Sequence, residues 1–499
     1  MADKVLLINN CAEKAKYGAV GYRKMRDAIS RLVKADRTRG LKTVVIDLSN
    51  PLQMKKYKAA AISDHRSEVQ NKNAIDAVYA AIQPHYLVLI DGPDVIPHIR
   101  LKNPIPNQDD KDVPSDLPYA SDEPFITRDA AAYARVTRVV GRIPGVTGTS
   151  DASFLASQIK NAASFKSGKR EDYLSYFAIS SYDWRKSTEI SIENIFRSGS
   201  VKISPPANSS NIARMLTPLS HFINCDGKKG APKFFGRRGS TLVTSITSDE
   251  IAKGVNRNTI VAAESCFGAQ LFAPSVAHGK LPIANAYLNA GAIAFFGSTT
   301  IAYGSRRGNG GADVIAQYFL SSVLEKASVG RAVLQARQRF VSTQKMESPV
   351  SVKTLAQFIL LGDPSLQPIA YDGPQRVFQR EAVGTRRVAL AAAGEAVASC
   401  SGFPRTKIKK RTQLHKQVRA IALRSGFKLR ATSVDGYKVI GGKSYAKAMN
   451  ARNVTQSVFV VTESRSIGGR KLKSESAKRI LVAHAQNSRL TGVFEYVQR

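Results

Sequence analysis

A cysteine and an acidic dipeptide stand where the reactive groups of an α/β protein are usually found. Cys266 follows the apolar run 259–265, and Asp226-Gly227 follows a second apolar run, 219–225. Ligands of an open parallel sheet bind beyond the carboxyl ends of its strands, so we expect both positions at one edge. A thiol there can attack a carbonyl carbon, and backbone N–H groups can stabilise the resulting oxyanion. The candidates for shaping that oxyanion site are Gly227, Cys266 and Gly268.

Cysteine usage leaves such a nucleophile free, although a buried, inert cysteine is the plain structural alternative for Cys266. The four cysteines, at positions 11, 225, 266 and 400, show no CxxC spacing. This predicts neither a zinc site nor a disulfide framework and fits a reducing compartment. The N-terminus lacks the pattern of a signal peptide, and no apolar run approaches the roughly 20 residues that span a bilayer. We therefore expect a cytoplasmic protein with no membrane partner.

The elements that position these residues are predicted from short apolar runs that alternate with helical patterns. Buried strands are expected at 5–9, 43–46, 86–90, 176–180, 219–225, 259–265 and 292–297. Helices are expected at 71–82, 209–216, 282–290, 312–324, 329–341 and 352–361. This alternation is typical of a mostly parallel sheet with helices on its faces.

Length and charge divide the 499 residues into three predicted parts. Residues 1–168 are expected to form an N-terminal α/β subdomain, 169–373 a second α/β subdomain, and 374–499 a small basic α+β module. In that module we expect a helix at 383–398 and strands at 458–462, 480–483 and 492–496. Residues 375–499 hold 26 Lys and Arg against 6 Asp and Glu, within a chain of net charge +36. Either this charge only solvates the surface, or it binds an acidic partner such as nucleic acid, an acidic protein or anionic lipid.

Six segments occur in order along the first 370 residues. They are Asp94-Val95-Ile96-Pro97, Pro114-Ser115-Asp116-Leu117-Pro118-Tyr119-Ala120, Val140-Gly141-Arg142-Ile143-Pro144, Glu264-Ser265-Cys266-Phe267-Gly268-Ala269, Ala292-Ile293-Ala294-Phe295-Phe296-Gly297-Ser298-Thr299 and Leu360-Leu361-Gly362-Asp363-Pro364-Ser365-Leu366. Together they resemble the gingipain-like cysteine peptidases, a branch of the caspase–hemoglobinase class. The resemblance implies a caspase-like sheet preceded by a related α/β subdomain, with Cys266 as nucleophile. It does not cover the basic C-terminal module.

The main departure from that family lies at Asp226. Family members carry His-Gly where this chain reads Asp226-Gly227, and the His handles protons. A carboxylate of pKa near 4 is a poor proton acceptor from a thiol near 8.5, and its charge disfavours the thiolate. His221 is expected on the opposite face and too far back along its strand, and His278 follows Cys266 instead of preceding it. Two accounts stay open, a natural pseudo-peptidase and a replacement of His by Asp that inactivates the enzyme.

Glu264 is the candidate for substrate selection. It stands two residues before Cys266, so strand alternation points it to the same side. In related enzymes an acidic residue at this offset often lies in the specificity pocket, where it would pair with Arg or Lys of the substrate. The alternative is a structural salt bridge within the sheet.

Two functions from different classes follow. The first is an intracellular cysteine endopeptidase that cleaves proteins after exposed Arg or Lys, and that is activated by proteolysis or by a partner protein, by family analogy in bacterial defence. The second is a catalytically dead scaffold whose residues 375–499 bind nucleic acid or an acidic protein. No cofactor is required by either, although the carboxylate-rich stretch 103–124 could hold Ca²⁺.

Overall fold

The computed structural model describes most of the chain up to residue 370 and parts of the C-terminal module. The described residues are 2–105, 110–197, 199–305, 308–370, 405–408, 412–427, 432–439, 456–464, 478–486 and 489–499. The helix predicted at 383–398 therefore lies outside the described residues.

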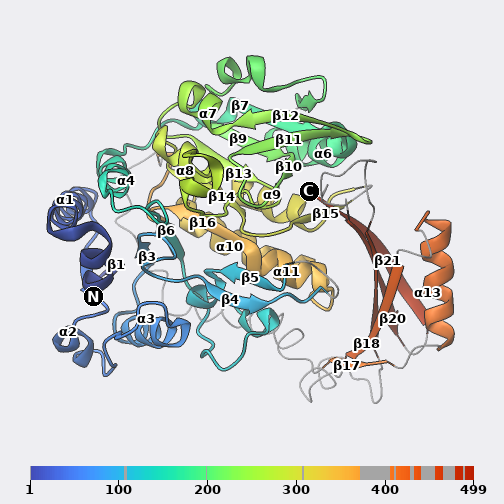
Figure 1. The fold of residues 1–499 in the computed structure, drawn as a ribbon, viewed down its shortest axis with the longest axis horizontal. Coiled ribbons are helices and arrows are strands. Elements are labelled where there is room, and N and C mark those ends of the chain that lie inside the picture. Colours follow the sequence, from blue (N-terminus) through green and yellow to red (C-terminus); the bar gives the residue numbers. More distant parts are fainter. Residues whose placement is uncertain are drawn as a thin grey trace.

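A ten-stranded sheet forms the centre of the molecule (Figure 1). In spatial order its strands are β2 (Thr43–Asp47), β1 (Lys4–Ile8), β3 (Tyr86–Ile90), β6 (Val140–Ile143), β16 (Phe358–Gly362), β14 (Ala294–Ser298), β13 (Ile260–Ala263), β9 (Ser220–Asn224), β7 (Tyr176–Ser181) and β8 (Lys202–Ser204). The first five run parallel to one another, and so do the last five. Only β16 and β14 pair antiparallel, so the carboxyl ends of the two halves point to opposite edges.

Helices cover both faces of this sheet, as expected for strands buried on both sides. They are α1 (Asn10–Thr38), α2 (Pro51–Lys55), α3 (Glu68–Ile82), α4 (Ser153–Ser164), α5 (Arg170–Leu174), α6 (Arg185–Phe196), α7 (Ser248–Gly254), α8 (Ile283–Asn289), α9 (Ala312–Leu324), α10 (Val329–Thr343) and α11 (Pro349–Gln357). The mixed α/β class with a mostly parallel, caspase-like sheet is thus confirmed. No helix among the described residues is long and apolar enough to cross a membrane.

Two helix predictions need correction. The stretch 352–361 is not one helix, because α11 ends at Gln357 and β16 begins at Phe358. A short apolar run cannot be assigned to helix or strand from periodicity alone, and here the run fills the centre of the sheet. The stretch 209–216 forms a 3-10 helix, Ser209–Met215, instead of an α-helix.

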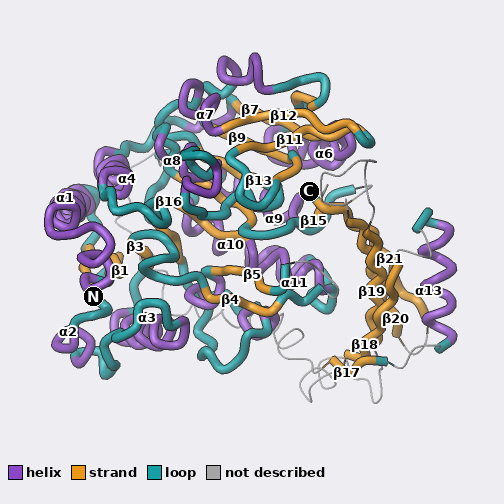
Figure 2. Tube along the Cα trace, viewed as in Figure 1, coloured by secondary structure: helices purple, strands orange, loops and turns teal. Residues whose placement is uncertain are grey.

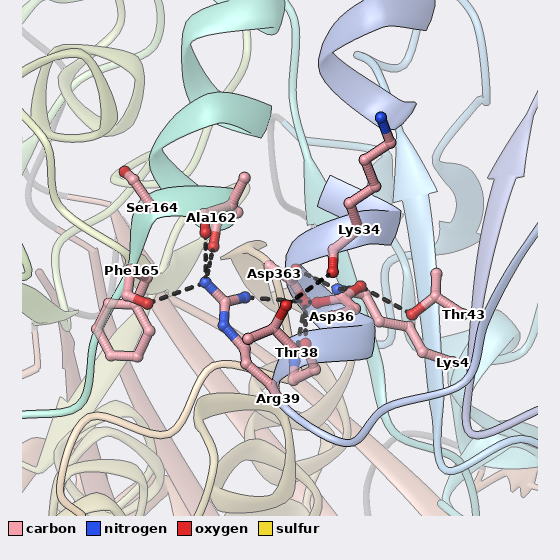
Figure 3. Close-up of polar contacts among 12 residues, drawn as sticks. Lys4, Lys34, Asp36, Thr38, Arg39, Thr43, Ala162, Ser164, Phe165 and Asp363 are labelled. Atoms are coloured by element: carbon pink, nitrogen blue, oxygen red, sulfur yellow. Dashed lines mark hydrogen bonds and ion pairs between the residues drawn. The ribbon is translucent and has the colours of Figure 1, made fainter. Parts of the chain in front are cut away.

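Buried ion pairs hold the N-terminal half of the sheet against the turn after β16. Lys4, at the start of β1, pairs with Asp36 of α1 and with Asp363, and all three side chains are fully buried (Figure 3). Arg142 of β6 binds both carboxylate oxygens of Asp116, at 3.0 and 2.7 Å. Three of the six motif segments, those that contain Asp116, Arg142 and Asp363, therefore carry these structural pairs.

A six-stranded antiparallel sheet joins the C-terminal residues to one short strand of the α/β part (Figure 2). Its order is β15 (Tyr303–Ser305), β21 (Arg489–Gln498), β20 (Lys478–Gln486), β19 (Gln456–Ser464), β18 (Thr432–Val439) and β17 (Arg405–Lys407), with α13 (Gln413–Arg424) on one face. The strands predicted at 458–462, 480–483 and 492–496 lie within β19, β20 and β21. The strand β15 belongs to the α/β part, where it precedes α9, whereas β21 belongs to the C-terminal module. The pairing of these two strands therefore joins the module to the α/β part.

Candidate active site

The structure brings Asp226-Gly227 directly against Cys266. The strands β9 and β13 are parallel neighbours, in a register that aligns Ile223 with Ala263. Asp226 lies two residues after the end of β9, and Cys266 lies three residues after the end of β13. Asp226-Gly227 forms the short strand β10. A Cβ atom on Gly227 would lie 1.6 Å from the carbonyl oxygen of Cys266, so only glycine allows this approach of the two backbones.

The Cys266 thiol is fully buried against the backbone of Ala302. The Ala302 N–H donates to Sγ at 3.2 Å, and the Ala302 carbonyl oxygen lies 3.5 Å from the same atom. Burial raises the pKa of the Cys266 thiol well above its usual value, and the charge of Asp226 raises it further. A thiol in this environment stays protonated at neutral pH, and its reactivity therefore requires a base or a change of surroundings.

Asp226 is held by an arginine instead of facing a histidine. The Arg237 guanidinium, on β11 (Lys233–Arg238), donates to both carboxylate oxygens at 2.9 to 3.1 Å. Burial raises the pKa of the Asp226 carboxyl, and the Arg237 charge opposes that rise. The ion pair leaves Asp226 without the basicity that proton transfer from a thiol needs.

The two histidines considered above lie away from the thiol. His221 is buried in the first half of β9, where its ring nitrogens lie 3.1 Å from the Tyr287 hydroxyl and 3.0 Å from the Pro218 carbonyl oxygen. Burial lowers the pKa of His221 to about 4. His278 is exposed at the end of the 3-10 helix Pro274–Ala277. Neither is placed to accept a proton from Cys266.

A pocket beside Cys266 holds the guanidinium of Arg499, which is fully buried. One guanidinium nitrogen, Nη2, lies 2.8 Å from Asp313, 3.0 Å from the Ser187 hydroxyl and 2.9 Å from the Ser305 carbonyl oxygen. The guanidinium carbon lies 4.9 Å from the centre of the Trp184 ring, within the range of a cation–π contact.

Backbone contacts fix the carboxylate of Asp313 in this pocket. It lies in the first turn of α9, and its second oxygen accepts from the N–H groups of Ser305, at 2.8 Å, and Gly310, at 3.1 Å. A Cβ on Gly304 would come within 2.1 Å of Arg499, so the guanidinium lies directly on the Gly304 backbone. Asp313 was not among the predicted site residues, although an acidic residue at the start of the helix predicted at 312–324 is a usable signal.

The backbone of Arg499 lies beside the thiol. Its N–H donates to the Ala302 carbonyl oxygen at 3.0 Å, and its own carbonyl oxygen accepts from the Cys266 N–H at 3.3 Å. The residues before it continue as an antiparallel pair, with Gln498 opposite Tyr303 and Tyr496 opposite Ser305. An extended peptide therefore reaches Cys266 along β15, with an arginine side chain in the pocket.

Glu264 lies beside Asp313, and Gly268 lies in the turn that follows Cys266; the substrate-binding roles of both residues stay predictions. Glu264 is fully buried. Its pKa is raised well above the usual value by burial and by the neighbouring Asp313. It thus lies close to Asp313, which itself receives the guanidinium. The Gly268 N–H donates to the Ser265 carbonyl oxygen at 3.2 Å and is already used within the turn.

Three carboxylates of the stretch 103–124 pair with cations of the protein. Asp110 pairs with Lys353, Asp116 with Arg142, and Asp122 with Arg135. Within the residues that the structure describes, no group of three or more His, Cys, Asp or Glu side chains could hold a metal ion. Asp109 lies outside the described residues.

The fold and the placement of a cysteine beyond a strand end are those of the caspase-like cysteine peptidases. A model of peptidase family C25 matches residues 11–369, and the chain belongs to this family. The predicted resemblance to gingipain-like peptidases is thereby confirmed.

Solved structures show weaker similarity, and no curated protein matches the chain. A chain described as "Structure of Protease" is 11% identical, with a TM-score of 0.46, over 99% of this chain and 97% of that chain. A chain of the separase–securin complex of Saccharomyces cerevisiae is 14% identical, with a TM-score of 0.28, over 46% of this chain and 14% of that chain.

Proposed function

We propose that this C25 protein is a cysteine endopeptidase fold that accepts an extended peptide and cleaves after a basic residue, arginine in particular. One observation carries the proposal: Arg499 has its guanidinium on Asp313 and its carbonyl oxygen 3.3 Å from the Cys266 N–H. This is the position in which the carbonyl of a scissile bond would meet both a nucleophile and an oxyanion donor.

In this proposal Cys266 has two roles. A proton carrier at the position of Asp226 takes the thiol proton, the thiolate attacks the carbonyl carbon after arginine, and the proton passes to the amine that leaves as the C–N bond breaks, so that a thioester forms. The Cys266 N–H stabilises the oxyanion, and water then hydrolyses the thioester and regenerates the thiol. The close packing of Gly227 on Cys266 fixes the nucleophile, and Asp226 occupies the position of the proton carrier.

Selectivity for arginine rests on the shape and charge of the pocket. The carboxylate of Asp313 and the carbonyl oxygen of Ser305 accept from a planar guanidinium that also lies against Trp184. These hydrogen bonds come from one guanidinium nitrogen, which an ammonium group could replace, so the preference for arginine rests on the contact of the planar guanidinium with Trp184. Glu264, buried beside Asp313, would add a polar group beneath the pocket. Protein substrates would therefore present arginine, and lysine less well, in an extended segment.

The Asp226–Arg237 ion pair favours a second candidate, a C25 fold that binds peptides ending in arginine without cleaving them. The two candidates differ in turnover. Peptides with arginine, lysine or leucine before a coumarin leaving group test hydrolysis, and a ketone probe bearing arginine tests covalent capture of Cys266 by intact mass. Capture together with hydrolysis, both lost in Cys266→Ala, supports the peptidase. Arginine-dependent peptide binding with neither, even when Asp226→His is combined with Arg499→Ala, supports the binding protein, and no arginine preference in that variant refutes both.

The cytoplasmic location, the activating partner and the part in bacterial defence stay predictions.

A further inference from the structure

We propose that β21 and Arg499 form an inhibitory strand that occupies the substrate groove of the same chain, and that the edge of β15 is the surface to which an incoming peptide adds. This rests on the proposed function, because it treats the groove as the peptidase's substrate site. The occupant is a segment of the protein itself, residues 496–499.

The first argument is that β21 uses the groups that a substrate needs. The Cys266 N–H donates to the Arg499 carbonyl oxygen, and the Ala302 carbonyl oxygen accepts from the Arg499 N–H. The edge of β15 is already paired with β21 in antiparallel register. Strand addition to an exposed edge is a common way of binding peptides, and one edge accepts one strand. A substrate cannot reach these donors and acceptors while β21 stays in place.

The second argument is that the arginine pocket is closed over its occupant. The side chains of Arg499 and Asp313 are both fully buried in their ion pair. Two guanidinium nitrogens of Arg499, Nε and Nη1, lack hydrogen-bond partners among the described residues. The occupant therefore fills the pocket but leaves polar atoms unsatisfied, which is costly in a buried site. The buried ion pair with Asp313 therefore blocks the pocket to the arginine of a second peptide.

The third argument is that the C-terminal module holds the strand in place. β21 pairs along its length with β20, and the module has a core of its own that includes Val418, Phe459 and Leu481. Tyr496 and Ile480 pack in the main core cluster of the α/β part. A tethered ligand acts at an effective concentration of roughly mM, so even a weak strand can compete with free substrate. The module thus keeps the groove occupied without tight intrinsic binding.

The test compares Arg499→Ala with the matched control Arg489→Ala, in the full chain. Both changes remove an arginine from this segment, but Arg489 is exposed at the start of β21, whereas Arg499 directly follows its last residue, Gln498. The first probe is a fluorescein-labelled peptide with the sequence of residues 493–499, followed by anisotropy. The second is the alkylation rate of Cys266 by iodoacetamide, read by peptide mass mapping, with the exposed Cys11 as an internal reference. Neither readout requires hydrolysis, so an inactive catalytic centre does not affect the result.

We expect Arg499→Ala to bind the peptide at least about tenfold more tightly than the unmodified chain and to alkylate Cys266 faster, because the tethered competitor loses the side chain that fills the pocket. The Arg489→Ala variant should behave like the unmodified chain. Adding Gly304→Ala to Arg499→Ala should abolish peptide binding, because a Cβ there fills the guanidinium position. Equal binding by all variants, or no binding by any, overturns the proposal.

A second measurement covers the case in which Arg499→Ala does not fold. The unmodified chain with mM peptide must then show faster hydrogen exchange at the amides of residues 496–498, because the peptide displaces them. Unchanged exchange at saturating peptide overturns the proposal. If the strand is displaced but arginine peptides are not cleaved even after Asp226→His is added, the inhibitory strand stands and the peptidase proposal fails.

Discussion

Replacing Asp226 with histidine tests the chemistry most directly, and the structure shows that the single change has a cost. The substitution supplies an imidazole next to Cys266, but it removes the partner of Arg237. The two side chains are 9% and 14% exposed and are joined by three contacts of 2.9 to 3.1 Å. The fate of Arg237 therefore decides how much activity the histidine can restore.

The magnitude follows from this burial. Breaking a buried ion pair by removing one partner costs about 3–5 kcal/mol, and we expect the low end, about 3 kcal/mol, because Arg237 retains some solvent contact. The unpaired guanidinium would also disfavour the imidazolium form of a neighbouring histidine, which lowers its pKa. A second change, Arg237→Gln, removes both effects. General acid–base catalysis contributes about 10²- to 10⁴-fold, so the double variant should gain in that range and the single variant less.

The assay measures kcat/KM for an arginine–coumarin peptide in the Arg499→Ala background, where the groove is expected to be open. Urea unfolding of the same proteins should show Asp226→His destabilised and Asp226→His/Arg237→Gln partly recovered. Adding Cys266→Ala gives the background rate. If both histidine variants stay at that background while an arginine ketone still labels Cys266, the argument that a missing base limits this protein is wrong.

Three further predictions concern the pocket, the fold and the module. Asp313→Asn should lower kcat/KM for arginine peptides by roughly 10²- to 10³-fold in an active background, because a guanidinium is left buried without its counter-ion, and a comparable loss for leucine peptides would contradict this. Asp116→Asn should reduce the free energy of unfolding in urea by about 3–5 kcal/mol, because it leaves Arg142 fully buried and unpaired. Burial alone would raise the pKa of Asp116, but Arg142 and His98 hold this pKa far below its usual value. The Asp116 carboxylate therefore stabilises the folded state above the unfolded pKa near 3.9, and this stability is lost as the pH falls through the lower folded pKa. Urea unfolding midpoints measured at a series of acid pH values should show this loss for the native chain and not for Asp116→Asn. If residues 375–499 bind a polyanion, the affinity for the polyanion should fall steeply between 50 and 200 mM salt. Salt-insensitive binding would mean that the positive charge of these residues only solvates the surface.

The sequence predicted the limits of the buried elements well where an apolar or amphipathic segment is bounded by turn-forming residues. The strand at 86–90 and the helix at 312–324 have the predicted limits, because each is a continuous apolar or amphipathic segment between clear breaks. The prediction for 352–361 failed because the change from α11 to β16 occurs without a glycine or a proline to mark it. Packing in the centre of the sheet decides that boundary, and local sequence does not record it.

The candidate site was predictable only as far as neighbouring strands could place it. Cys266 and Asp226-Gly227 follow adjacent parallel strands, so their proximity follows from topology. The pairing of Arg499 with Asp313 joins residues 186 positions apart, through a strand added to β15, and no periodicity reveals such a contact. The offset of Glu264 from Cys266 predicts a carboxylate at the substrate pocket. The carboxylate that contacts the arginine side chain, Asp313, comes instead from the start of α9.

Two separate restraints act on Cys266, and they act on different atoms. Burial and the charge of Asp226 keep the thiol protonated, whereas Arg499 occupies the N–H that would stabilise an oxyanion. Displacing β21 alone should therefore expose the groove and speed alkylation of the thiol without giving efficient hydrolysis. Installing a histidine alone should supply a base to a thiol that substrate cannot reach. Hydrolysis requires both changes, so a protein that remains inactive after either one is consistent with the structure, and one that remains inactive after both is not.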